Sequence, residues 1–193
     1  GGAKNAPRLV KNLCTIMSSE AEIKDLSPLF DMKSLECLNQ DSSHVVTNCM
    51  KQGPRDDDAV FLASDCDEQL LINLRFKQPV RLHSIAVKAL EADKAPRHLK
   101  LFSNPVNMSF DSAESDQCTQ EVEFTPEQVA DGTVINLRYV KFQNVTSLSM
   151  FVGKNFGDED QTVIHKLMLY GTAGNNTNMG DWEKVAKKAM ESQ

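Results

Sequence analysis

Hydrophobic and polar residues alternate with a period of two from about residue 70 onwards. Ile72, Leu74 and Phe76 occupy one phase, and polar residues occupy the other. This alternation is typical of a strand with one buried face. The pair at residues 78–79, Gln-Pro, predicts a turn, and a second strand is expected over residues 80–87.

The same period returns in several short segments separated by polar residues. Alternating segments occur at residues 99–101, 122–124, 140–142, 148–152 and 163–169. A phase slip near His83 and Ser84 indicates a β-bulge, and Asp131-Gly132 indicates a tight turn. The residues expected to point into the core are Ile72, Leu74, Phe76, Val140, Phe142, Met150, Val152 and Leu167. About eight short strands without intervening helices predict an all-β protein, a β-sandwich or jelly roll.

The N-terminal region has a helical rather than a strand pattern. Residues 8–17 carry apolar side chains at helical spacing. Ser19 and Glu22 form a capping-box pattern that predicts a second short helical turn near Ile23 and Leu26. We therefore expect a leader over residues 1–22, followed by the sandwich domain over residues 23–173.

The C-terminal residues 174–193 predict a polar linker followed by a short amphipathic helix. A helix of about ten residues is marginal alone, so its apolar stripe needs a surface to lie on. Two interpretations are open: the helix packs back on the sandwich, or it docks on a partner with Trp182 as its anchor. The candidate partner-binding residues are Trp182, Lys184, Val185, Lys187, Lys188 and Met190.

Composition and charge narrow the classes of function. The 193 residues include 21 Lys and Arg against 27 Asp and Glu, a formal net charge of −6. An acidic domain is a poor candidate for nucleic-acid binding, and no apolar run is long enough to span a membrane. Five scattered cysteines without a C-x-x-C motif predict reduced thiols in a cytoplasmic or nuclear protein. We expect a monomer.

No catalytic constellation accompanies this pattern. The motifs of serine hydrolases, zinc proteases and phosphate-binding loops are absent from the sequence. His165 is interpreted as a hydrogen-bonded core or rim residue. Asp65, Asp67 and Glu68 offer a weak calcium pattern, for which a solvated turn is the favoured alternative. Cys66 lies between Asp65 and Asp67, which raise the pKa of its thiol, so it is not expected to act as a nucleophile. We predict no enzyme activity, no cofactor and no metal.

Several stretches together resemble the PITH domain, a module of proteasome-interacting, thioredoxin-like proteins. The resemblance is carried by residues 35–39 (LECLN), 64–72 (SDCDEQLLI), 107–111 (NMSFD), 137–145 (LRYVKFQNV) and 154–157 (KNFG), and it continues to residue 171. These stretches cover most of residues 23–173 in the expected order.

The resemblance implies a galactose-binding-domain-like jelly roll that docks its protein on the regulatory particle of the proteasome, in cytoplasm and nucleus. It implies no catalytic residues. The W-C-x-x-C motif of thioredoxin is missing, so the chain is expected to be a fragment of a longer protein or a stand-alone PITH protein. The alternative is a carbohydrate- or small-ligand-binding jelly roll. The small number of aromatic residues, with only two Tyr and one Trp, disfavours a sugar site.

Overall fold

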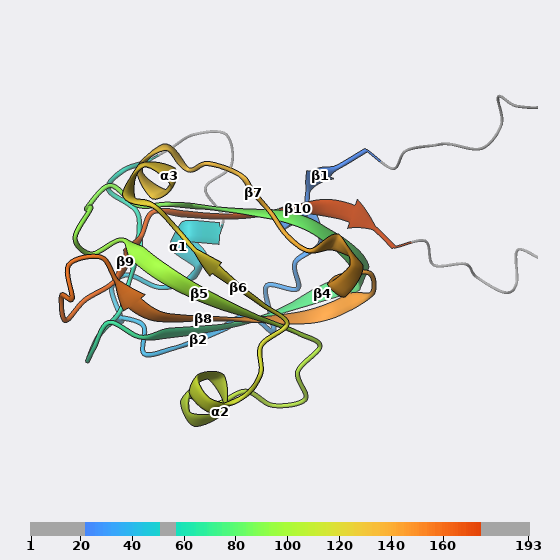
Figure 1. The fold of residues 1–193 in the computed structure, drawn as a ribbon, viewed down its shortest axis with the longest axis horizontal. Helices are drawn as coiled ribbons and strands as arrows, with labels where there is room; N and C mark the ends of the chain where they lie inside the picture. The colour runs from blue at the N-terminus through green and yellow to red at the C-terminus, as the bar shows by residue number, and fades with distance from the viewer. Residues whose placement is uncertain (1–21, 51–56, 175–193) are drawn as a thin grey trace, which may run out of the picture.

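The computed structural model describes residues 22–50 and 57–174, which form two packed layers of antiparallel strands (Figure 1). The strands are β1 (Lys24–Asp25), β2 (Glu36–Leu38), β3 (Leu62–Ala63), β4 (Leu70–Lys88), β5 (Pro96–Ser103), β6 (Gln120–Glu123), β7 (Ile135–Asn136), β8 (Val145–Asn155), β9 (Val163–Ile164) and β10 (Lys166–Ala173). The helices are α1 (Thr47–Met50), α2 (Phe110–Ser115) and α3 (Pro126–Asp131), with 3-10 turns η1 (Ser27–Leu29) and η2 (Tyr139–Lys141).

Strand β4 belongs to both layers. Its first half pairs with β2 and β8, and β8 continues to β5 and β6. Its second half pairs with β10 and β7, and β10 continues to β1. The small β3–β9 pair lies beside this sheet. The predicted all-β jelly roll is therefore confirmed, and three short helices, which the alternation pattern did not predict, occur between its strands.

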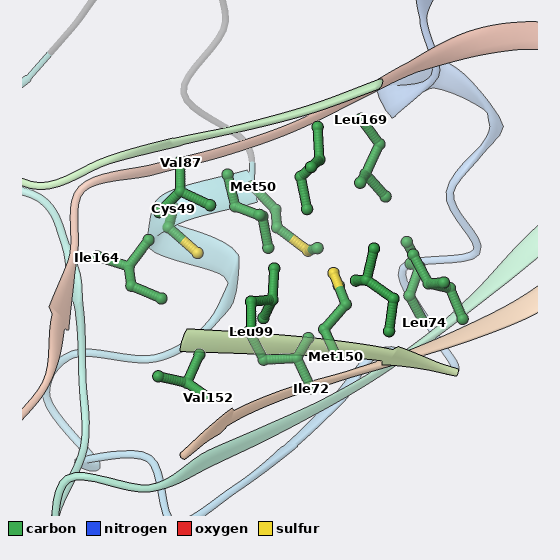
Figure 2. Close-up of a cluster of buried hydrophobic side chains, with 14 of the residues drawn as sticks. Cys49, Met50, Ile72, Leu74, Val87, Leu99, Met150, Val152, Ile164 and Leu169 are labelled. Carbon is green, nitrogen blue, oxygen red and sulfur yellow. The ribbon is translucent and has the colours of Figure 1, made fainter. Parts of the chain in front are cut away.

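The core fills the space between the two layers (Figure 2). Ile72, Leu99 and Met150 reach it from the lower layer, while Val87 and Leu169 reach it from the upper layer, and all five are buried. Seven of the eight expected core residues are buried, namely Ile72, Leu74, Phe76, Phe142, Met150, Val152 and Leu167. The period of two thus placed the strand phases of β4, β8 and β10 correctly.

Val140 is the exception, with 84% of its surface exposed. It lies in the 3-10 turn η2, whose period of three residues per turn replaces the alternation of a strand. Phe142, at the end of that turn, is fully buried, and its carbonyl accepts a hydrogen bond from the Leu82 N–H. The expectation that residues 140 and 142 share one strand face was wrong.

The turn expected at Gln78-Pro79 is also absent, because β4 runs through it. The register between β4 and β8 shifts between Arg75 and Val80, where β4 passes from one layer to the other. Proline has no N–H to donate to a neighbouring strand, and at this interruption of the β4–β8 ladder no such hydrogen bond is required. The Pro79 carbonyl instead accepts the Gly174 N–H at 2.8 Å.

The bulge expected near His83 is confirmed. Tyr170 pairs with Ser84 and Gly171 pairs with Leu82, so His83 is the extra residue of β4. At this point the backbones approach so closely that a Cβ on Gly171 would lie 2.1 Å from the Arg81 carbonyl oxygen. Only glycine fits there.

Two local turn predictions have a different outcome in the structure: a turn does occur at Gly132, but it follows a helix, and the segment near Ile23 pairs as a strand. Asp131-Gly132 ends helix α3, which Thr125 and Gln128 start with a capping box. Gly132, at φ 67°, is the left-handed residue after that helix. The helical turn expected near Ile23 and Leu26 is instead strand β1 followed by η1, since Lys24 and Asp25 pair with the edge of β10. The leader helix expected at residues 8–17 lies outside the described residues.

Candidate functional site: a polar groove on the outer sheet face

A groove of about 500 Å³ lies on the outer face of the layer formed by β2, β4, β8 and β5. Its floor consists of two rows of side chains across the strands. Glu36, Asn73 and Ser149 stand opposite one another in the first row, and Arg75 stands opposite Ser147 in the second. Opposed residues of antiparallel strands project on the same face, so these five side chains share one surface.

Two loop segments form the walls. Residues 33–35 precede β2 and stand on one side, and residues 105–108 follow β5 and stand on the other. The walls carry apolar side chains, among them Leu35, Met108 and Val106, the last with 90% of its surface exposed. The groove therefore combines a polar floor with apolar sides.

Asn104 fixes the start of the second wall. It takes a left-handed conformation at φ 55°, which asparagine tolerates better than most residues. Its Oδ1 accepts hydrogen bonds from the N–H groups of Thr146 and Ser147 at 2.8 and 3.2 Å, and its Nδ2 donates to the Asn144 carbonyl. The loop is thereby tied to strand β8.

Helix α2 limits the groove at one end. It covers the next row of the same sheet face, where Leu71 and Phe151 stand opposite each other. Phe110 meets Phe151 edge to face at a ring distance of 6.2 Å. Lys100 Nζ donates to the carbonyls of Ala113 and Glu114 at the end of α2. Figure 1 shows α2 below this layer, on the side away from the core.

The charged side chains of the groove differ in their hydrogen bonding. Asn73 Nδ2 donates to Glu36 Oε2 at 3.3 Å, and Ser149 Oγ donates to Asn73 Oδ1 at 2.6 Å. The Arg75 guanidinium and the Lys33 ammonium make no hydrogen bond or ion pair within residues 22–50 and 57–174. The groove thus holds one engaged carboxylate and two cations with unused donors.

The acidic segment at residues 64–69 is a turn tied to Asn39. Asn39 Nδ2 donates to Asp67 Oδ1 and to the Gln69 carbonyl, both at 2.7 Å, while Asn39 Oδ1 accepts the Cys66 N–H. Asp67 Oδ1 also accepts the Gln69 N–H at the start of β4. The described residues contain no group of three or more His, Cys, Asp or Glu side chains suited to a metal ion. The carboxylate of Asp67 caps the strand, as the turn interpretation predicted.

A second acidic loop, at residues 157–160, does not join two paired strands. It connects β8 to β9, but β9 pairs with β3 and not with β8. Asn155 closes it, donating from Nδ2 to the Glu159 carbonyl and accepting the Glu159 N–H at Oδ1. The loop is thus a connection between two sheets.

The thiols divide by environment. Cys37 and Cys49 are buried, and burial raises the pKa of the Cys37 thiol to about 12 and that of Cys49 still further. Cys66 is exposed, and the Asp65 carboxylate raises the pKa of its thiol. The prediction that Cys66 is a poor nucleophile is supported. Cys14 lies outside the described residues.

His165 is a buried histidine engaged by the backbone. Only 6% of its surface is exposed, and its Nδ1 accepts the Leu90 N–H at 3.3 Å. Burial lowers the pKa of the imidazole, so the neutral ring is favoured. The interpretation of a hydrogen-bonded core or rim residue is confirmed.

The site residues chosen from the sequence and the groove do not coincide. Trp182, Lys184, Val185, Lys187, Lys188 and Met190 all lie outside the described residues. The floor residues of the groove escaped notice because each belongs to the polar phase of a strand. Nothing in the sequence connects Glu36 on β2, Asn73 and Arg75 on β4, and Ser147 and Ser149 on β8, and only the strand order brings them together.

Solved structures with this architecture define the class of fold. A family 32 carbohydrate-binding module of Clostridium perfringens NanJ, solved with galactose, aligns with a TM-score of 0.55 at 6% identity over 77% of this chain and 99% of its own. An F5/8 type C domain from Bacteroides fragilis aligns with a TM-score of 0.53 at 10% identity, over 81% of this chain and all of its own. The domain is a galactose-binding-like jelly roll, and at these identities the likeness shows the fold alone.

The chain belongs to the PITH domain family, whose model matches residues 17–187. Thioredoxin-like protein 1 of Schizosaccharomyces pombe is 39% identical over 175 residues, which are 87% of this chain and 59% of that protein. PITH domain-containing protein 1 of Xenopus laevis is 35% identical over 150 residues, 73% of this chain and 66% of that protein. The chain therefore spans about three fifths to two thirds of the length of these relatives.

Proposed function

We propose that this domain is a non-catalytic interaction module that docks its protein on the regulatory particle of the proteasome. The observation that carries the proposal is the PITH match over residues 17–187, since the family takes its name from a proteasome-interacting, thioredoxin-like context. We further propose that the protein acts as a monomer in cytoplasm and nucleus, without binding nucleic acid or membrane. None of the described helices is long and apolar enough to cross a membrane.

The polar groups of the described residues favour a module without catalysis. Each histidine there has a structural partner. His44 pairs with Asp41 and His98 lies 3.7 Å from Glu121. His83 Nδ1 lies 3.3 Å from Ser84 Oγ, but Ser84 has only 2% of its surface exposed, so a substrate does not reach that hydroxyl. A nucleophile needs both an activating base and access.

The C-terminal tail is proposed as one docking element. Trp182 would serve as its aromatic anchor, with Val185 and Met190 beside it, and Lys184, Lys187 and Lys188 would meet an acidic surface. Strand β10 ends at Ala173, and Gly174 still bonds to Pro79. A chain ending at Gly174 therefore keeps every described strand and separates folding from docking.

A pull-down with purified proteasomes tests the proposal. The tagged full chain is expected to retain the regulatory particle, and the chain ending at Gly174 is expected to bind at least about tenfold more weakly, because a buried interface tryptophan contributes about 2 kcal/mol or more. Trp182→Ala should reproduce most of that loss. Equal binding by full and shortened chains would exclude the tail, and no retention by any chain would exclude proteasome docking.

The carbohydrate alternative has less support. No aromatic side chain lines the groove on the described surface, whereas ligand pockets are usually rich in aromatic residues. The NanJ module solved with galactose shares the fold at only 6% identity. We therefore do not propose sugar binding for this chain.

A further inference from the structure

We propose that the groove between residues 33–35 and 105–108 binds a short acidic peptide segment of a partner protein. This proposal is independent of proteasome docking and of the tail. It rests on two cations that pair with no described residue, Arg75 on the floor and Lys33 on a wall, on the apolar walls and on the size of the groove. The occupant is defined by chemistry: one or more carboxylates flanked by aliphatic side chains.

Charge complementarity carries the first step. Arg75 stands on the floor, opposite Ser147, and its guanidinium engages no described group. Lys33 adds a second cation, whose ammonium pairs with none of the residues that the structure describes. Glu36, the one acidic residue among the described residues that line the groove, accepts a hydrogen bond from Asn73 Nδ2. A guanidinium presents five donors in a planar fork that matches a carboxylate, so an Arg75 without a partner among the described residues favours an anionic ligand.

The apolar walls of the groove favour a peptide over a simple anion as the ligand. Leu35 and Met108 line opposite sides, and Val106 projects at the rim with 90% of its surface exposed. A phosphate or a free carboxylate would leave uncovered the Val106 side chain and those parts of Leu35 and Met108 that are not packed against the core clusters. A peptide that alternates aliphatic and acidic side chains would cover them while it paired with Arg75, and the exposed area lost to water would add to affinity.

The shape agrees with a chain of a few residues. A volume of about 500 Å³ falls in the range of ligand pockets, and the polar floor spans neighbouring strands about 4.8 Å apart. Ser147 Oγ and the Asn107 amide make no hydrogen bond to the part of the chain that the structure describes, so their donors and acceptors remain for the peptide backbone. The net charge of −6 disfavours nucleic acid as the source of negative charge.

Fluorescence anisotropy with labelled pentapeptides tests the inference on the full chain. The probe Leu-Asp-Leu-Asp-Leu is expected to bind, and the matched probe Leu-Lys-Leu-Lys-Leu is not. Arg75→Gln should weaken the acidic probe about tenfold or more, because a charge-assisted hydrogen bond is lost. Arg75→Lys keeps the positive charge but lacks the planar fork of donors, so its affinity for the acidic probe should lie between those of the parent chain and Arg75→Gln.

Matched substitutions outside the groove exclude general effects of charge. Arg81→Gln removes the same charge from the same strand in its other half, where Arg81 pairs with Thr172, and should leave binding unchanged. Val106→Asp at the rim should weaken the acidic probe, whereas Val134→Asp, half exposed on another segment, should not. Arg75 and Val106 are exposed, so variants at these positions are expected to have the same thermal midpoint as the parent chain.

Four results would overturn the proposal. These are no binding of the acidic probe, equal binding of the lysine probe, equal losses for Arg75→Gln and Arg81→Gln, and displacement of the probe by galactose or inorganic phosphate at low millimolar concentration. The last would assign the groove to a sugar or a free anion.

Discussion

Replacing Phe142 by alanine probes whether the chain between β7 and β8 closes the core. The Phe142 ring is fully buried in the main hydrophobic cluster, while its backbone is held by the Leu82 N–H and by its own N–H to the Tyr139 carbonyl. Alanine keeps both backbone hydrogen bonds, so the change removes the ring alone. The expected loss combines the transfer of a buried aromatic ring with the cavity it leaves.

Such truncations lower the free energy of unfolding by about 3–5 kcal/mol. This is a change of two to nearly four powers of ten in the folding equilibrium. Val140→Ala is the matched control, because Val140 lies two residues away with 84% of its surface exposed. A substitution at an exposed site is expected to stay within about 0.5 kcal/mol.

Urea denaturation followed by far-ultraviolet circular dichroism measures both variants against the parent chain. The Phe142→Ala midpoint should fall while the slope of free energy against urea stays the same, which reports a change in stability and not in compactness. A loss below 1 kcal/mol for Phe142→Ala, or equal losses at the two positions, would refute the assignment of Phe142 to the core.

Three further perturbations test other parts of the structure. Asn39→Ala removes the side-chain hydrogen bonds to Asp67, Gln69 and Cys66 and places alanine at φ 61°, so we expect a loss of about 1–3 kcal/mol in urea denaturation; an unchanged midpoint would show that the turn is not held by this amide. Asp65→Asn removes the carboxylate charge that raises the pKa of the Cys66 thiol, so that pKa should fall. Iodoacetamide should then alkylate Cys66 faster at pH 8, while variant and parent should react equally fast at a pH well above the thiol pKa of each. An unchanged rate at pH 8 would contradict that electrostatic cause. A chelator combined with a reductant should leave the thermal midpoint of the chain unchanged, and a fall of many degrees would reveal a metal or disulfide that supports the fold.

Much of the core was predictable from the sequence because a strand's period is a local property. The alternation in β4 and β8 specifies which side chains face inward, since successive residues of a strand project on opposite faces. The slip at His83 marked a bulge for the same reason. Even so, β4 proved to be one strand and not two, because Pro79 falls where the ladder is interrupted and the chain changes layer.

Where a short segment has competing local solutions, tertiary contacts decided the outcome. Val140 and Phe142 alternate like strand residues, yet a 3-10 turn separates their faces and only Phe142 meets the core. Lys24 and Asp25 became a strand because β10 offered an edge to pair with. The local sequence gives no signal that this strand edge is available, because the pairing partner is about 145 residues away along the chain.

The same physical distinction separates the two candidate binding sites. The apolar stripe around Trp182 is periodic and was visible in the sequence, although its structure lies outside the described residues. The groove around Arg75 cannot be recognised from the sequence alone, because its floor comes from three strands and its walls come from two loops about 70 residues apart. Local periodicity determines which residues face inward or outward, whereas the order of strands in the sheet determines which outward residues become neighbours.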